Sequence, residues 1–322
     1  MDLKNDSTVV SLHEIGSSTN VLGWFATNLL CHWNGTNRII VRDLRGAEFI
    51  QRGAIALDSG TRPAGLAYNA TRQLLAWSEG TSSASVYLES LAAPGHRTEL
   101  RSDVPGLIPF RFSEDGNFLA AWSNARDSLR VWNVEAGQIV ASIGGLVRDA
   151  TFAAGGLVLV AAIEPGQNHE IKFYDLTHSD RAPQRVPRKN VPVPVSVAVS
   201  PDGGLVALPS LGGQVQLYDP AKGESIEDLH GHLNAVFSLA FSTDGRRLIS
   251  TSGGREAVKL WDVGTRQELL TLSGTGSFLE AARWSADGDV ILAGAPWQAW
   301  RAPSWEEIAA SEEKEKTDVQ RH

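Results

Sequence analysis

The sequence predicts an all-β chain, a β-propeller of seven four-stranded antiparallel blades, and a repeated turn motif is the main reason. A serine opens the pattern Ser-x-Asp-Gly at Ser113, Ser200, Ser242 and Ser285. The spacings are 87, 42 and 43 residues, so the first spans two periods, and residues 152–156 lie where the intervening copy is expected. Propeller blades of this type repeat every ~40–45 residues. Four turns in one register therefore predict one blade per period.

Residues 230–272 contain the clearest copy of the repeating unit. Gly231 and His232 open it, four short apolar segments follow, and the third segment ends in Trp261 and Asp262. The Ser-Thr-Asp-Gly turn between the first two segments supplies the backbone angles that a tight hairpin needs. This frame of four strands between Gly-His and Trp-Asp resembles the WD-repeat family, whose repeats form the blades of a β-propeller.

The other blades depart from this pattern to different degrees. The seven predicted blades span residues 21–60, 61–104, 105–145, 146–190, 191–230, 230–272 and 277–303. At the end of the third strand, where the clearest copy has Trp-Asp, the first five blades carry Arg42-Asp43, Glu89-Ser90, Trp132-Asn133, Tyr174-Asp175 and Tyr218-Asp219. We interpret the aromatic residues and the aspartates at these positions as structural signatures of the blades.

The two ends of the predicted ring complement each other. The seventh blade has only three predicted strands, whereas residues 7–16 form a strand without a hairpin partner. The resemblance implies that this N-terminal strand completes the last blade and closes the ring, which hides sheet edges that would otherwise pair with other chains. We expect one domain over residues 1–303 and then a short helix and charged tail over 304–322. A chain cut from a longer protein is the alternative.

Composition and charge restrict the classes of function. The chain has 322 residues, a formal net charge of −8 and one cysteine, Cys31. A negative net charge disfavours binding to the phosphate backbone of nucleic acids, and a single cysteine excludes an internal disulfide. The N-terminus lacks the apolar core of a signal peptide, and the longest apolar run, residues 152–163, is too short to span a bilayer. We expect a cytoplasmic monomer that does not enter a membrane.

No residue pattern indicates catalysis. The histidines show no spacing typical of a zinc site, residues 274–276 lack the third glycine of a dinucleotide loop, and no Gly-x-Ser-x-Gly elbow occurs. We therefore predict no catalytic residue, cofactor or metal. The resemblance implies a buried hydrogen-bonded set of His232, Trp261 and a serine or threonine within 250–252. Glu256 lies one place away from the usual position of the acid in that set.

Three tryptophans suggest a contact surface. Trp33, Trp77 and Trp122 each fall at the end of a predicted second strand, in blades one, two and three. The loops that follow second strands share one face of a propeller, and tryptophan is enriched in binding hot spots. A partner-binding patch is one interpretation, and packing of large side chains between blades is the other. The basic segment 181–190 is interpreted as an irregular sheet edge, because its prolines cannot donate to a ladder.

The function favoured by the sequence is that of a non-catalytic scaffold, which binds a protein or peptide on one face of the propeller. Residues 297–308 resemble the C-termini of bacterial WD-repeat proteins, some of which carry such repeats beside a signalling kinase. This resemblance implies a role in bacterial signalling. The alternatives are a hydrolase or lyase with a site in the central channel, or a sensor module of a signalling enzyme, because one fold hosts many activities.

Overall fold

The computed structural model is entirely β in the part of the chain that it describes, and its strands form seven four-stranded antiparallel sheets. The described residues are 10–11, 21–25, 29–33, 36–45, 48–58, 60–80, 82–153, 158–164, 169–178, 180–188, 196–253, 256–274, 280–284, 288, 290–294 and 298–301. We number the sheets as blades one to seven in chain order.

The strands follow one another through each blade from the first to the fourth. Blade one holds β2 (Val21–Phe25), β3 (Leu29–Trp33), β4 (Arg38–Arg45) and β5 (Glu48–Ala56). Blade two holds β6 (Pro63–Asn69), β7 (Leu74–Glu79), β8 (Ser85–Ser90) and β9 (Ala93–Arg101). Blade three holds β10 (Leu107–Phe112), β11 (Phe118–Ser123), β12 (Ser128–Asn133) and β13 (Gln138–Gly144). Blade four holds β14 (Leu146–Ala153), β15 (Val158–Glu164), β16 (His169–Asp175) and β17 (Gln184–Arg188).

Blades five and six keep this order of strands, whereas the fourth strand of blade seven comes from the N-terminus. Blade five holds β18 (Ala198–Val199), β19 (Val206–Pro209), β20 (Gln214–Asp219) and β21 (Glu224–His230). Blade six holds β22 (Ser238–Phe241), β23 (Arg247–Thr251), β24 (Val258–Asp262) and β25 (Glu268–Leu272). Blade seven holds β26 (Glu280–Trp284), β27 (Val290–Gly294), β28 (Gln298–Arg301) and the N-terminal β1 (Val10–Ser11).

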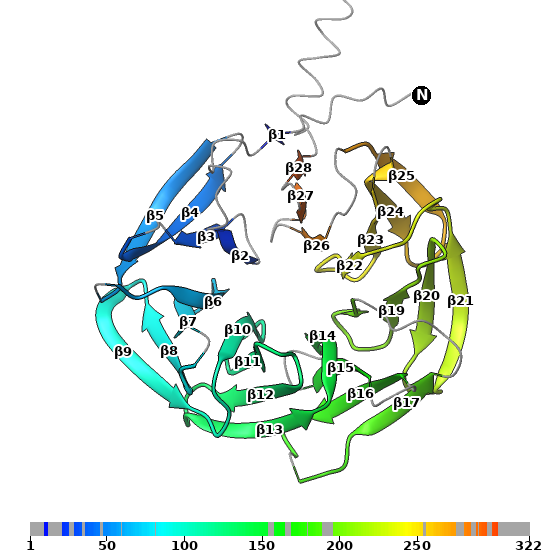
Figure 1. The fold of residues 1–322 in the computed structure, drawn as a ribbon. Coiled ribbons are helices and arrows are strands. Elements are labelled where there is room, and N and C mark those ends of the chain that lie inside the picture. Colours follow the sequence, from blue (N-terminus) through cyan, green and yellow to red (C-terminus); the bar gives the residue numbers. More distant parts are fainter. Residues whose placement is uncertain are drawn as a thin grey trace, which may run out of the picture.

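The blades are arranged around a common centre in chain order (Figure 1). The first strand of each blade lies nearest the centre, and the fourth strands of blades one to six lie at the rim. Contacts between successive first strands link the blades, as between β6 and β10 or between β22 and β26. This arrangement brings equivalent residues of different blades to the same level of the ring.

The N-terminal strand belongs to the last blade, as the sequence predicts. Val10 pairs with Ala299 and Ser11 with Gln298, in an antiparallel ladder at the outer side of β28. The rest of the segment 7–16, and the helix and tail expected over 304–322, lie outside the described residues.

The repeated Ser-x-Asp-Gly motif builds the same turn in three blades. In each, the serine hydroxyl donates to the aspartate carboxylate over 2.5–2.6 Å and accepts the backbone N–H five residues later over 2.9–3.0 Å. The serines are Ser113, Ser200 and Ser242, and the aspartates are Asp115, Asp202 and Asp244. The glycine of each turn has a φ between 70° and 77°, which favours glycine. The side chain thus replaces a ladder bond and fixes the hairpin between first and second strands.

The basic segment of blade four is an edge strand. β17 forms the outermost strand of its sheet, with Pro187 opposite Glu170. An outer strand needs no N–H on its solvent side, so it tolerates the proline. The prediction of an edge is confirmed by this placement.

Candidate functional site

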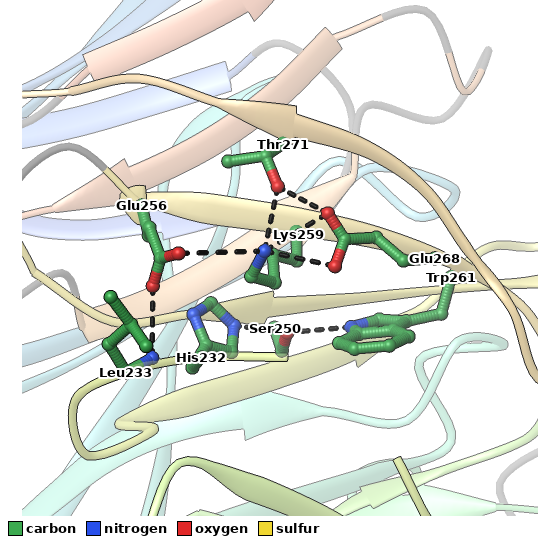
Figure 2. Close-up of polar contacts among 8 residues, drawn as sticks. All are labelled: His232, Leu233, Ser250, Glu256, Lys259, Trp261, Glu268 and Thr271. Atoms are coloured by element: carbon green, nitrogen blue, oxygen red, sulfur yellow. Dashed lines mark hydrogen bonds and ion pairs between the residues drawn. The ribbon is translucent and has the colours of Figure 1, made fainter. Parts of the chain in front are cut away.

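Blade six contains a hydrogen-bonded chain of buried side chains (Figure 2). The indole N–H of Trp261, on β24, donates to Ser250 Oγ on β23 over 2.8 Å. His232 Nε2, from the loop before β22, lies 2.7 Å from the same oxygen. Because the serine accepts from the indole, its own proton is available for the lone pair of a neutral imidazole. Ser250 is therefore the serine that the resemblance placed within residues 250–252.

The acid of this set takes a different place from the one expected. Glu256 Oε2 accepts the backbone N–H of Leu233 over 2.9 Å, beside the histidine and not on its ring (Figure 2). His232 Nδ1 has no hydrogen-bond partner among the described residues. Burial, and then the nearby charge of Lys259, lower the pKa of His232 to about 4. The imidazole is therefore neutral at pH 7.

A second polar group lies directly above the first. The ammonium of Lys259, almost fully buried, contacts both carboxylate oxygens of Glu268 at 3.0 and 2.9 Å and Thr271 Oγ1 at 2.8 Å. Burial alone would raise the pKa of Glu268, but hydrogen bonds from Thr271 and Lys259 hold it below its usual value. A buried ammonium is tolerated only with such a partner. The pair ties the third strand of blade six to its fourth.

We expect the stability of the protein to fall at acid pH through His232. The pKa of His232 is about 4 in the folded protein, whereas an ordinary imidazole has a pKa of 6.5. The unfolded chain therefore binds more protons than the folded protein between these two pH values. Neutral His232 makes its full contribution to the free energy of unfolding above about pH 6.5. This contribution, about 3 kcal/mol at most, is lost as the pH falls toward 4. Urea unfolding from pH 4 to 7 measures it.

His232→Gln is the matched control, since it keeps a polar side chain near Ser250 but does not titrate. Carboxylates also titrate in this range, so the wild-type curve is compared with that of the variant. The two curves should converge as the pH falls. Parallel curves over the whole range would show that the buried histidine does not carry this pH dependence.

Other residues at the ends of third strands link neighbouring blades or close turns within a blade. The indole N–H groups of Trp132 and Trp300 donate to carbonyl oxygens of the preceding blade, Arg101 over 3.3 Å and Ser273 over 2.9 Å. Three aspartates each accept a backbone N–H two or three residues later, over 2.8–2.9 Å. These are Asp175, Asp219 and Asp262. Such bonds close the turn between the third and fourth strands.

Strand pairing separates the three tryptophans that the sequence placed together. Leu119 on β11 pairs with Trp132, and Leu75 on β7 pairs with Glu89, which holds the same place in blade two. Trp122 lies three residues after the first leucine and Trp77 only two after the second, so their side chains leave opposite faces of their strands. Trp77 occupies the place of Ser250 in blade six. Trp33 shares the register of Trp122.

Burial separates these residues further. Trp77 is 0% exposed and packs on Tyr87 at 4.7 Å between ring centroids, with the guanidinium of Arg97 at 5.0 Å from its ring. A side chain without surface cannot contact a partner, so for Trp77 the packing interpretation holds. Trp122 is partly exposed and stacks on Phe110 at 3.8 Å. The side chain of Trp33 lies outside the described residues, and a partner role for it and Trp122 stays a prediction.

Two exposed leucines mark a site that the sequence did not indicate. Leu211, in the loop between β19 and β20, is 57% exposed, and Leu233, in the loop before β22, is 85% exposed. The two loops touch, because Val236 N–H donates to the carbonyl of Ser210 over 3.1 Å. A Cβ at Gly213 would collide with the carbonyl oxygen of His232. We call this surface the leucine face.

Comparison with known proteins identifies one repeat of the chain. The family model described as "WD domain, G-beta repeat" matches residues 223–262, which end at the Trp-Asp of β24. This match and the WD-repeat relatives support the WD-repeat family for the chain. The matched WD repeat contains His232, Ser250 and Trp261, so the buried network lies inside it.

Several WD-repeat relatives resemble parts of the chain. An uncharacterized WD repeat-containing protein of the cyanobacterium Synechocystis is 26% identical over 179 residues, 55% of this chain and 48% of that protein. WD repeat-containing protein 1 of chicken is 36% identical over 80 residues, 24% of this chain and 13% of its own length. Mitogen-activated protein kinase-binding protein 1 of mouse is 38% identical over 77 residues, which are 24% of this chain and 5% of that protein. The chain thus spans less than half the length of these relatives.

The described residues contain no group of three or more histidine, cysteine, aspartate or glutamate side chains placed to hold a metal ion. No helix in this part of the chain has the length and apolar character to cross a membrane.

Proposed function

We propose that this WD-repeat protein is a non-catalytic scaffold that binds a protein or peptide partner on the leucine face. The observation that carries the proposal is the exposure of Leu211 and Leu233 on two touching loops. WD-repeat proteins generally mediate protein–protein interactions, and the name of the mouse relative describes it as kinase-binding. Apolar side chains on a fixed backbone suit an interface core, since little conformational entropy is lost when they are covered.

The loops that carry these leucines are held by the buried network beneath them. Leu233 follows His232 directly, and its backbone N–H is bound by Glu256. Gly213 lies against the carbonyl of His232, so a larger residue there would push the loops apart. The hydrogen-bonded set of blade six thus presents Leu233 in a defined position, which links the WD signature to the proposed interface.

The proposed scaffold is a closed ring of seven blades, with residues 1–303 as one domain. Seven four-stranded sheets around one centre and the pairing of Val10 with Ala299 support this (Figure 1). We further infer a monomer in the bacterial cytoplasm that acts in signalling. A cyanobacterial relative supports a bacterial setting. Cell fractionation and sedimentation would test the location and the oligomeric state.

Leu233→Asp should abolish capture of the partner, because it places a charge at the centre of an apolar contact, where truncations alone cost about 2 kcal/mol or more. Affinity capture from the native host with quantitative mass spectrometry measures this. Leu269→Asp is the matched control, since Leu269 is 47% exposed but lies on the outer strand β25. Equal capture by wild type and Leu233→Asp, with both variants folded, would contradict the leucine face as the interface.

A further inference from the structure

Two arginines share one level of the ring near its centre. Arg111 lies on β10 and pairs with Ala120, and Arg283 lies on β26 and pairs with Leu292. Each arginine is followed directly by an aromatic residue, Phe112 on β10 and Trp284 on β26. These two aromatic residues occupy the same position in the first strands of their blades. They therefore occupy equivalent places in blades three and seven, on strands that lie close to the centre (Figure 1).

The other blades carry only small residues at this level. The strand pairings place Gly23, Ala67, Thr151, Ala198 and Ala240 at the position of the two arginines. Arginine is therefore a specific exception here and not a feature of the repeat.

The charges of these arginines are not paired within the described chain. Arg111 donates to Thr151 Oγ1 over 3.0 Å, and Arg283 donates to the carbonyl oxygen of Ala282 over 2.7 Å. Both acceptors are neutral. By contrast, the buried Arg130 holds Asp103 through two hydrogen bonds of 2.8 and 2.9 Å.

The carboxylate whose charge acts on Arg283 is already engaged in hydrogen bonds. Asp149 raises the pKa of Arg283, but its two oxygens accept the backbone N–H groups of Ala150 and Val197 over 2.8 and 2.9 Å. Burial, and then the charge of Arg111, lower the pKa of Arg283 to about 9, so the guanidinium of Arg283 remains charged at pH 7. Among the described side chains, Arg111, Arg283 and Asp149 carry a net positive charge between them, whereas the whole chain has a net charge of −8.

We propose that Arg111 and Arg283 form an anion site at the centre of the ring, which binds a small doubly charged oxyanion of the phosphate class. Arg111 and Arg283 are both partly buried residues that keep some accessible surface. Guanidinium groups match phosphate oxygens in geometry and bind them by two parallel N–H bonds. A dianion between two cations would relieve their repulsion and replace the missing counter-charge.

The site is tested with inorganic phosphate on the full chain. Calorimetric titration at constant ionic strength should show saturable binding, and the melting temperature should rise with the logarithm of phosphate concentration. Arg111→Gln and Arg283→Gln should each weaken binding about tenfold or more, as expected for loss of a charge-assisted bond. Arg101→Gln removes the same charge from a side chain that is 82% exposed, and it should bind like wild type.

Melting curves in chloride alone identify variants that fail to fold. If Arg283→Gln does not fold, Arg283→Lys takes its place, because lysine keeps the positive charge but lacks the planar guanidinium. Its affinity for phosphate should lie between that of wild type and the loss expected for the glutamine variant. No saturable phosphate binding by wild type, or equal binding by both glutamine variants, would overturn the proposal. Succinate bound as tightly as phosphate would contradict the phosphate class, whereas weaker succinate binding supports it.

Discussion

Replacing Trp261 by alanine is expected to lower the free energy of unfolding by about 3–5 kcal/mol, the range typical of buried tryptophan. The side chain is 2% exposed and belongs to the apolar cluster that joins blades five and six, with Leu217, Leu229 and Leu248. Its loss opens a cavity and leaves Ser250 without the indole N–H. Natural stability is about 5–15 kcal/mol, so a large part of the total should be lost. Urea unfolding at pH 7 measures the change.

Trp261→Phe separates packing from hydrogen bonding. Phenylalanine keeps most of the apolar volume but has no N–H, so the loss should be nearer 1–2 kcal/mol, including about 1 kcal/mol for the hydrogen bond. Ser250→Ala should cost a similar amount, because it leaves both His232 and the indole without their partner. A loss below about 1 kcal/mol for Trp261→Ala would show that this signature residue does not hold the two blades together.

Deleting residues 1–16 is expected to lower the melting temperature sharply and to promote aggregation. The deletion removes β1 and exposes the outer edge of β28, which then presents unpaired N–H and C=O groups to other chains. It also removes the contact between the two ends of the described chain. Differential scanning calorimetry and light scattering measure both effects.

Removal of residues 310–322 serves as the control for the deletion. The last described strand ends at Arg301, so this shorter chain should melt within a few degrees of wild type. An N-terminal deletion that melts like wild type and stays monomeric would show that blade seven does not depend on β1.

Much of the fold was predictable because each blade repeats the same local chemistry. The turn at Ser242 needs a serine, an aspartate and a glycine at fixed spacing, and the structure forms it wherever the described chain has them. The N-terminal strand β1 could be assigned to the last blade by counting, since blade seven lacked one strand. Such features depend on near neighbours in the sequence, which is why a single chain reveals them.

The candidate sites were harder to predict because they depend on register and on other blades. One residue of misalignment grouped Trp77 with Trp122, although a slip of one position reverses the face of a strand. The exposure of Leu233 depends on how its loop meets Gly213 of the previous blade. Arg111 and Arg283 stand 172 positions apart in the sequence. An aligned table of first-strand residues would have indicated the pair, because the other blades have small side chains there.

Ring closure by the N-terminal strand is tested most directly by a disulfide between its paired positions. Val10 and Ala299 face each other across β1 and β28, so Val10→Cys with Ala299→Cys, in a Cys31→Ser background, should form an intramolecular bond under mild oxidation. Val10→Cys with Leu269→Cys joins β1 to another blade and should not. A cross-linked monomer, seen by mass spectrometry and non-reducing electrophoresis, is the expected result. A cross-linked dimer, or no cross-link at all, would contradict closure within one chain.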